Sequence, residues 1–351
     1  KETPEGMQLY TAYQDLFPRQ FSEQFLFEEN IGDYYKDTYT KDERKAAQQD
    51  KNQNEKQMIA KLGEIQRFMK KHYPESRRRK YYALVAFDGD SMGKWLAGTF
   101  YKQGIDFREV QEKLSLSLGK FAQWVRSHLK TDADETKGEL LGSVVYAGGE
   151  DFMGFIPVNH LFHVLKTLRS KFTEMVTNEI SAYTDGKHAL TFSAGVCVAH
   201  YKSPLVYTTE TAKQMESKAK GFRDQKDALA ISVMKRSGEI NTTVFSWKNE
   251  NQDFLIDALE TIKEKFHDNV FSDAFVRNIA YEIREFDDGK TDMRDTEDLI
   301  LSESDRLIAR AFNRDGGFDG KEIQAMQQTV RTLYKAFADQ ESNEPSQSLE
   351  N

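Results

Sequence analysis

Two short acidic motifs in this sequence have the composition of a metal-binding site. Asp88 and Asp90 flank a glycine, and Glu150 and Asp151 follow a pair of glycines. In proteins, Mg²⁺ is bound by carboxylate oxygens together with the phosphates of a substrate. The four carboxylates are therefore candidates for a site that binds a metal and a nucleotide.

The first motif follows the short apolar run from Tyr81 to Phe87, which predicts a buried central strand. Asp88 ends this strand, and a glycine-bearing turn leads into a helical segment from about Ser91. A carboxylate at this place can hold Mg²⁺, while the amides at the start of the helix can contact a triphosphate. An Asp-Gly-Asp triplet alone also occurs as an ordinary turn.

The second motif joins two apolar runs, Leu141 to Ala147 and Phe152 to Pro157, which predict a β-hairpin. Its glycines, Gly148 and Gly149, allow positive φ and a close approach of a ligand. A plain β-turn would explain the glycines. It would not explain two adjacent acids at the tip of a hairpin that is expected beside the strand of Asp88.

Together the motifs would cluster three or four carboxylates, which repel one another unless a divalent cation neutralises them. Two such cations about 4 Å apart can activate a ribose hydroxyl and stabilise a pyrophosphate leaving group. We predict Asp88, Glu150 and Asp151 as catalytic residues and metal ligands, with Mg²⁺ or Mn²⁺ as the two ions. For Asp90, a role in the turn and a role near the nucleotide both remain open.

The elements that must position these motifs follow the order of a ferredoxin-like palm. Apolar periodicity predicts helices over 107–129, 158–183 and 204–220, and strands over 189–200 and 228–235, the last strand of the sheet. This order is the split βαβ arrangement, βαββαβ, extended at its end. The fold class is α+β.

The rest of the chain is predicted to be helical. Beyond residue 246, four apolar stripes, one of them over 275–286, predict a helical bundle. The predicted organisation is a helical N-terminal segment and linker (1–79), a palm domain (80–245), a helical C-terminal domain (246–340) and a polar tail (341–351).

Composition limits the class of protein. The chain has 351 residues, of which 38% are hydrophobic and 30% charged, and a net charge of −8. It shows no apolar run of membrane-spanning length and no signal peptide, so we expect a cytoplasmic protein that does not bind membranes. A single cysteine, Cys197, excludes an internal disulfide and a thiolate zinc cluster. The start without Met and the polar end are consistent with a piece of a longer polypeptide.

A basic stretch precedes the first predicted strand, between Arg67 and Lys80. It is explained either as a solvated linker face or as a contact with RNA or nucleotide phosphate.

Four segments in order resemble a known family: residues 88–96, 146–151, 193–205 and 229–239. They are similar to the large polymerase-like subunit of type III CRISPR effector complexes, in its Cmr (III-B) form. A more remote similarity links the chain to GGDEF diguanylate cyclases. The family hairpin usually reads Gly-Gly-Asp-Asp, whereas Glu150 here is one methylene longer, which affects the choice of product more than the ability to bind metal.

The resemblance implies an antiviral subunit whose palm converts ATP into cyclic oligoadenylate when the complex binds target RNA. An alternative product is AMP joined to S-adenosylmethionine. The implied partners are the other subunits of the complex and, through it, CRISPR RNA and target RNA. The implied nucleotide-binding residues are Gly89, Asp90, Ser91, Gly93, Lys94, Gly148, Gly149, Lys220 and Lys235.

For Lys220 and Lys235 an exposed lysine at an element end is an equally good explanation. The family often carries a His-Asp nuclease domain; His267-Asp268 is the single such doublet in this sequence and has no partner histidines, so no nuclease activity is predicted. Two further alternatives are a stand-alone diguanylate-type cyclase and a catalytically silent scaffold that binds RNA and partner subunits.

Overall fold

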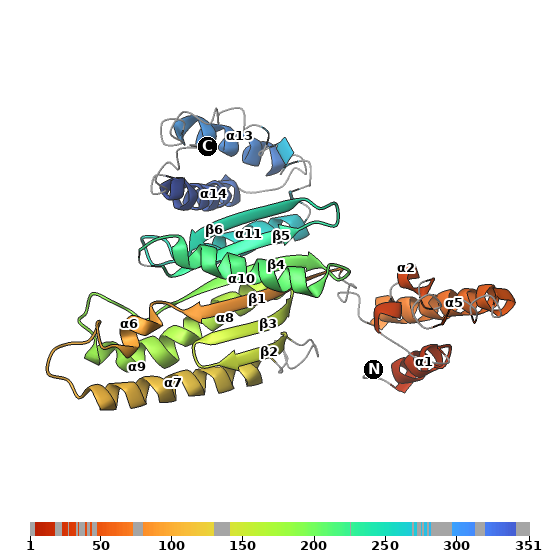
Figure 1. Ribbon diagram of the computed structural model, residues 1–351. Coiled ribbons are helices and arrows are strands. Elements are labelled where there is room, and N and C mark those ends of the chain that lie inside the picture. The colour runs from red at the N-terminus through yellow and green to blue at the C-terminus, as the bar shows by residue number, and fades with distance from the viewer. Residues whose placement is uncertain are drawn as a thin grey trace, which may run out of the picture. The chain divides into compact units, whose positions relative to one another are not determined.

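The computed structural model describes residues 4–17, 23–26, 28–32, 34, 39–40, 43, 48–72, 80–129, 141–224, 226–268, 270–271, 275, 277–278, 281, 297–312 and 320–341. The chain divides into two compact units, residues 1–79 and 80–351. The unit boundary lies just before the first strand (Figure 1). Part of the basic stretch, 73–79, lies outside the described residues.

The first unit is helical. It contains α1 (Pro4–Gln14), a 3₁₀ turn (Glu23–Leu26), α2 (Glu28–Ile31) and α5 (Gln48–His72). These elements share a small core of aromatic and aliphatic residues, made by Tyr13, Phe17, Phe25, Ile31, Tyr34, Met58 and Leu62.

The second unit is built on a sheet of six strands in the order β2-β3-β1-β4-β5-β6. The bounds are β1 Tyr81–Gly89, β2 Ser143–Gly148, β3 Asp151–Pro157, β4 Phe192–His200, β5 Ala228–Met234 and β6 Ile240–Ser246. All neighbours are antiparallel except β4 and β5. The central position of β1 explains its continuous apolar run, because both faces of this strand are covered.

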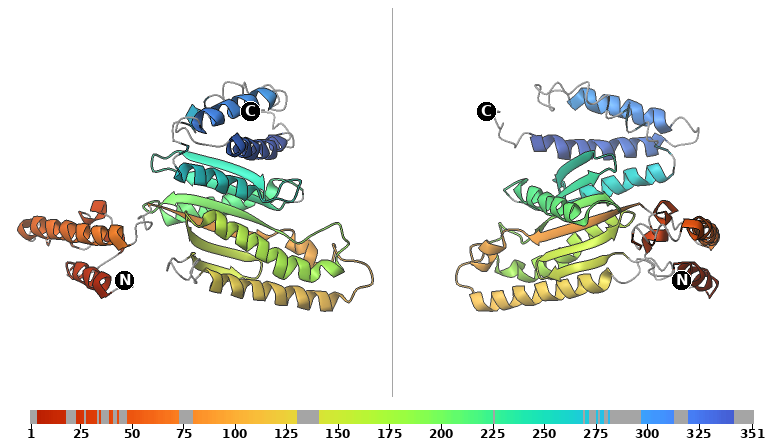
Figure 2. Two further views of the ribbon diagram at one scale, coloured as in Figure 1. Left: turned by 180° about the vertical axis from the view of Figure 1, so that it is seen from behind. Right: turned by 45° about the vertical axis from the view of Figure 1, so that its right-hand side comes forward.

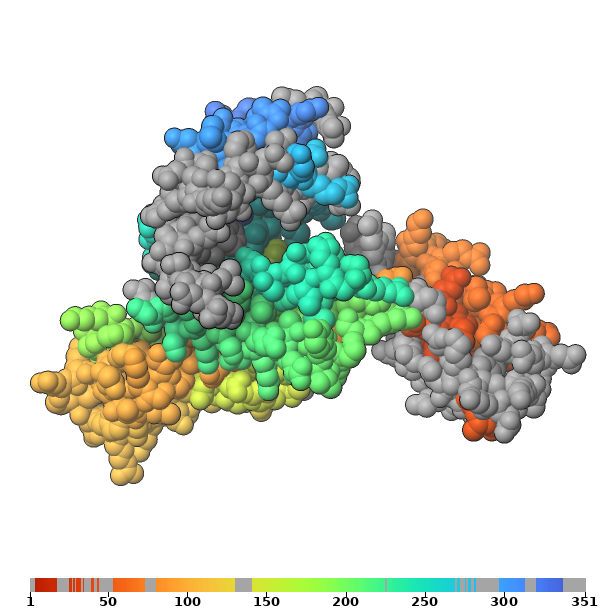
Figure 3. Space-filling model, turned by 45° about the horizontal axis from the view of Figure 1, so that its top comes forward, coloured from red at the N-terminus to blue at the C-terminus, as the bar shows by residue number. Residues whose placement is uncertain are grey.

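Helices cover both faces of the sheet. On one face lie α7 (Phe107–His128), α8 (Leu161–Phe172) and α11 (Leu255–His267), and on the other lies α10 (Leu205–Gly221). Figure 1 shows α10 in front of the sheet, and the view from behind in Figure 2 shows α8 and α11 there instead. The outer face of α10 is at the surface (Figure 3), where Val206 is 71% exposed.

Short elements complete this unit. Between β1 and α7 lies α6 (Met92–Leu96), and after α8 follow a π-helical turn (Thr173–Thr177), α9 (Asn178–Ile180) and a 3₁₀ turn (Ser181–Tyr183). The helix predicted over 158–183 is therefore interrupted. The strand–helix order confirms the α+β palm.

One prediction about the sheet was wrong. The strand at 228–235 is not the last, because β6 pairs with it in antiparallel register from Ala228↔Ser246 to Met234↔Ile240. In β6, the first residues are exposed and Val244 and Phe245 are buried. An apolar alternation is therefore missing from its first half, which is why the sequence pattern did not predict it.

The C-terminal region is helical, as predicted, with α13 (Glu297–Phe312) and α14 (Gly320–Glu341) after α11. The predicted helix over 275–286 falls largely outside the described residues. Leu255 and Ile256 of α11 and Leu333 of α14 join the main core of the sheet. A boundary between palm and C-terminal domain at residue 245 stays a prediction.

Candidate active site

Asp88 and Asp151 are brought together by strand register. Phe87 on β1 is the partner of Phe152 on β3, so the next positions outward on the two strands are Asp88 and Asp151. Opposed residues of an antiparallel pair point to the same face of the sheet. Phe87 and Phe152 face the core with α7 and α8, so both carboxylates lie on the other face, that of α10.

The hairpin that carries Glu150 and Asp151 is closed by its glycines. Gly148 pairs with Asp151, and Gly149 has φ +68°, in the left-handed region that favours glycine. The guanidinium of Arg126 on α7 donates a hydrogen bond to the carbonyl of Ala147, just before the turn. The turn is thereby fixed to a helix of the opposite layer.

Glu150 approaches the end of β1. A Cβ placed on Gly89 would lie 3.0 Å from the Cβ of Glu150 and 2.8 Å from the side chain of Met92. A side chain in place of the glycine between the two aspartates would displace Met92 and crowd Glu150. The structure brings all three predicted metal ligands to the same edge of the sheet.

The helix α10 adds two charged side chains to this edge. Nζ of Lys220 donates a hydrogen bond to Oδ2 of Asp88 and lies 3.5 Å from Oε1 of Glu216, one turn earlier on the helix. The side chains of Lys220 and Glu216 are 24% and 18% exposed. The predicted position of Lys220 at the site is therefore seen, and its ammonium group compensates carboxylate charge.

A close approach of helix and strand makes this contact possible. A Cβ at Gly195 on β4 would lie 2.1 Å from the backbone nitrogen of Glu216 and 2.3 Å from the carbonyl oxygen of Ala212. No side chain other than hydrogen fits between backbones at this separation. Gly195 pairs with Ala86, two residues before Asp88, so it seats α10 directly over the carboxylates.

The carboxylates perturb one another. Burial and the charge of Asp88 raise the pKa of Asp151, and burial and the charges of Asp88 and Asp151 raise the pKa of Glu216 against the opposing effect of Lys220. Burial acts to lower the pKa of Lys220, but Asp88 and Glu216 outweigh it and the pKa is raised. The site therefore carries excess negative charge, partly balanced by nearby lysine ammonium groups.

Asp90 has a structural role. It is 4% exposed, and its carboxylate accepts hydrogen bonds from the hydroxyls of Thr191 (2.7 Å) and Ser193 (2.8 Å) and from the backbone N–H of Asp227 (3.1 Å). Burial raises its pKa. These bonds tie the end of β1 to the start of β4 and to the loop before β5. The turn role is therefore favoured over contact with a nucleotide.

The turn after Asp90 leads into the short helix α6. Ser91 has φ +56°, unusual for a residue with a side chain, while Gly93 has open space around its Cα. Lys94 places Nζ 5.7 Å from the ring centre of Phe100. A contact of these three residues with a nucleotide stays a prediction.

Lys235 is not brought to the site. It follows the far end of β5 and forms an ion pair with Glu239 at 2.9 Å across the turn to β6. The site lies at the opposite end, since Asp88 pairs with Ser193 and Ala194 with Leu229. A strand of this length separates the two ends by about 20 Å. The predicted nucleotide contact of Lys235 is therefore corrected.

Sequence reasoning missed Glu216. Its spacing of four residues from Lys220 on a predicted helix was a usable signal, because such residues share one helix face. Lys213, whose charge lowers the pKa of Asp151, was also missed.

The donor set fits a divalent cation. Among the described residues, no three His, Cys, Asp or Glu side chains stand in an arrangement that would already hold a metal ion. Asp88 and Asp151 nevertheless offer hard oxygen ligands on one face, and their mutual repulsion would be relieved by a cation. Glu150 adds a third carboxylate at the same edge.

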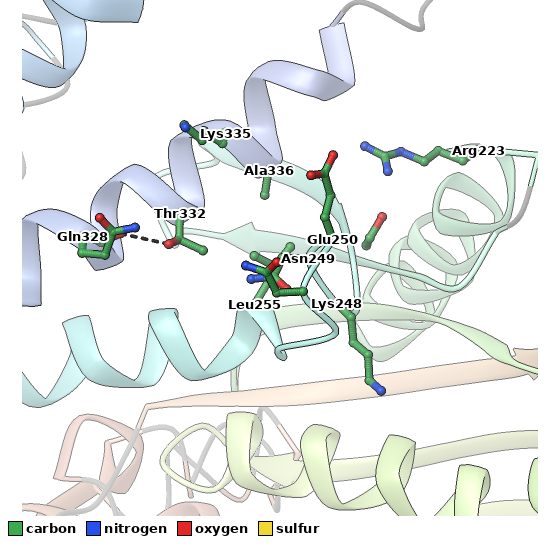
Figure 4. Close-up of a pocket in the computed structure, with 11 residues that line it drawn as sticks. Arg223, Lys248, Asn249, Glu250, Leu255, Gln328, Thr332, Lys335 and Ala336 are labelled. Atoms are coloured by element: carbon green, nitrogen blue, oxygen red, sulfur yellow. Dashed lines mark hydrogen bonds between the residues drawn. The ribbon is translucent and has the colours of Figure 1, made fainter.

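A pocket of about 330 Å³ lies at the same end of the sheet as this site. It is lined by the segment after β6, by α14 and by Arg223, which follows α10 (Figure 4). Since Ser246 pairs with Ala228, the pocket lies three strands from β1, about 14 Å at the usual strand spacing. It does not contain the carboxylates.

The sheet order and the paired carboxylates define a palm domain of the kind found in nucleotide polymerases and cyclases. Residues 81–230 match the family model of the second palm domain of Cas10/Cmr2. The predicted resemblance to the Cmr-type subunit of type III CRISPR complexes is confirmed.

A curated relative is the CRISPR system Cmr subunit Cmr2 of Pyrococcus furiosus. It is 29% identical over 255 residues, which cover 66% of this chain and 27% of that protein. The chain thus matches only a part of the length of this relative.

Three solved structures are remotely similar to this chain. A type III-B Cmr-beta complex in its apo state has a TM-score of 0.42 at 13% identity, covering 78% of this chain and 40% of the other. A Csm1–Csm4 cassette in complex with one ATP has a TM-score of 0.36 at 16% identity, covering 73% and 36%. The active GGEEF domain of a diguanylate cyclase from Vibrio cholerae has a TM-score of 0.26 at 22% identity, covering 41% and 78%. At this distance individual residues are assigned from this chain alone.

Within the described part of the chain, no helix is both long and apolar enough to cross a membrane.

Proposed function

We propose that this chain is the nucleotidyl-transferring palm of a type III-B CRISPR effector subunit and that it converts ATP into a cyclic oligoadenylate when the complex binds target RNA. The observation that carries the proposal is the juxtaposition of Asp88, Asp151 and Lys220 on one face of the palm. Paired carboxylates can hold the two metal ions of nucleotidyl transfer, and a neighbouring lysine can contact the phosphates. The match of residues 81–230 to the palm family model supports ATP as substrate.

The proposed role of each residue of the site follows from its charge. Asp88, Glu150 and Asp151 would hold Mg²⁺ or Mn²⁺, which supplies Lewis-acid activation of the attacking hydroxyl and stabilises the leaving pyrophosphate. Lys220 provides a positive charge beside these carboxylates for the phosphates of ATP. Asp90 holds the turn between strand and helix through its three hydrogen bonds.

A catalytically silent scaffold explains this site less well. A scaffold has no need for carboxylates whose charges raise one another's pKa, because that arrangement costs stability. The described residues give no support to S-adenosylmethionine as acceptor, so ATP alone is proposed. Partner subunits and RNA remain proposals that rest on the family.

Mass analysis of products tests the proposal. The chain is assembled with its complex and target RNA and incubated with Mg²⁺ and labelled ATP, and the products are resolved by mass. We expect cyclic oligoadenylates from the wild type and none from the double variant Glu150→Ala/Asp151→Ala. The same products from both proteins would show that these carboxylates do not carry the reaction.

A further inference from the structure

Two carboxylates share one ammonium group in this site. Lys220 Nζ bonds Asp88 and lies 3.5 Å from Glu216 Oε1. Glu216 and Lys220 sit four positions apart on α10, the spacing at which a glutamate before a lysine forms a favourable pair. Lys220 can therefore change its principal partner by rotating its side chain, without movement of the helix.

Binding of a divalent cation would favour such a change. Asp88 would offer its oxygens to the cation, which would repel the ammonium group that bonds Oδ2 of the same carboxylate. Lys220 would then be driven from Asp88 toward solvent or toward another carboxylate. Glu216 is the carboxylate already in contact range, and its low exposure of 18% reduces its contact with water.

We propose that Glu216 is a positioning residue for Lys220: it takes over the ammonium group when Asp88 binds a divalent cation and so keeps Lys220 beside the phosphates. This inference rests on the proposed metal-dependent function. Glu216 itself does not touch the cation in this account; it acts through Lys220.

The electrostatics agree with the geometry. Burial, and after it the nearby charges of Asp88 and Asp151, raise the pKa of Glu216, and Lys220 is the group that lowers it. A cation on the two aspartates would cancel that repulsion and favour the ionised Glu216 that Lys220 needs as partner. The backbone contact of Glu216 with Gly195 fixes the position of this residue on the sheet.

Mn²⁺ affinity without nucleotide, measured by electron paramagnetic resonance, tests the proposal in a double-mutant cycle. Glu216→Gln keeps the shape of the side chain and removes its charge. In the presence of Lys220 we expect this substitution to weaken Mn²⁺ binding roughly tenfold, because the ammonium group stays on Asp88. In the Lys220→Met background we expect less than a threefold change.

Controls separate the possible failures. Glu210→Gln, an exposed position on the same helix, should leave Mn²⁺ affinity unchanged, and unfolding curves should show each variant folded. If the wild type binds no Mn²⁺, the proposed metal-dependent function fails, and the inference fails with it. If the wild type binds Mn²⁺ but Glu216→Gln weakens binding equally in both backgrounds, or in neither, the positioning role is refuted and the metal site stands.

A second readout follows Lys220 directly. In the ¹⁵N spectrum of the lysine amino groups, the Lys220 Nζ signal should shift with Mg²⁺ and remain protected in the wild type. In Glu216→Gln it should merge with the solvent-exposed lysines when Mg²⁺ is added. Protection that persists in Glu216→Gln would contradict the proposal.

Discussion

Lys220 on α10 donates a hydrogen bond to Asp88 at the end of β1, a residue 132 positions away in sequence. The contact joins the helix that covers one face of the palm to the strand at its centre. It places the ammonium group of Lys220 beside Asp88 and Asp151, where negative charge is in excess.

The first prediction compares two lysines. Lys220→Ala should reduce ATP conversion in the RNA-bound complex on the order of 100-fold, since it removes a positive charge from the reacting phosphates. Lys235→Ala should leave the rate within about twofold, as expected of an exposed ion pair at the other end of the sheet. Initial rates with labelled ATP measure both. Equal losses in the two variants would contradict the assignment of the site.

The close packing of α10 against the sheet can be tested by adding a single methyl group, with a glycine-to-alanine substitution. Gly195→Ala should lower the free energy of unfolding by about 1–3 kcal/mol, because a Cβ there meets the backbone of Glu216. Gly119→Ala is the control: it lies within α7 with nothing within 4 Å of the added Cβ, and alanine there should stabilise by up to about 1 kcal/mol. Urea unfolding measures the difference, and a Gly195→Ala protein as stable as the wild type would show that the helix sits further from the strand.

Asp90 is predicted to matter for stability. Asp90→Ala leaves two hydroxyls and one backbone N–H without their acceptor, which should cost at least about 2 kcal/mol in free energy of unfolding. Asp224→Ala, an exposed aspartate before β5, should change stability by less than about 0.5 kcal/mol. Denaturant titration of both variants provides the test. A stable Asp90→Ala protein would return Asp90 to the candidates for nucleotide contact.

The carboxylate repulsion has a pH signature. The pKa of Asp151 is raised in the folded protein above its ordinary value of 3.8, so the folded state binds this proton more tightly than the unfolded state. Stability therefore falls as pH rises through the raised pKa. With chelator present, Asp151→Asn should melt at a higher temperature than the wild type at pH 7, and the difference should disappear below about pH 4. A lower melting temperature at pH 7 would mean that the aspartate is stabilised in the apo site.

Much of the fold was accessible from local patterns. The apolar run of β1 and the glycine pair of the hairpin predicted a central strand and its neighbour, because burial on both faces and positive φ leave clear marks in sequence. β6 left no such mark, since its first residues are exposed. Glu216 and the role of Asp90 depend on which residues of α10, β4 and the loop before β5 meet the end of β1. These contacts are determined by the packing of segments that are distant in sequence, and by the absence of a side chain at Gly195, which lets α10 approach β4.

The same distinction explains the two lysines. Lys220 and Lys235 each lie at the end of a predicted element, so the sequence alone gave no reason to distinguish them. The direction of the two elements distinguishes them, because α10 runs toward the carboxylates and β5 runs away from the carboxylates.

Pyrophosphate release from ATP by the RNA-bound complex is the most direct measurement of the central claim. The wild type should release pyrophosphate in the presence of Mg²⁺ and stop when the metal is chelated. Asp88→Asn, which keeps the size of the side chain, should reduce the rate on the order of 100-fold or more. Release that is unchanged in Asp88→Asn would contradict the account that the carboxylates of β1 and the hairpin carry nucleotidyl transfer.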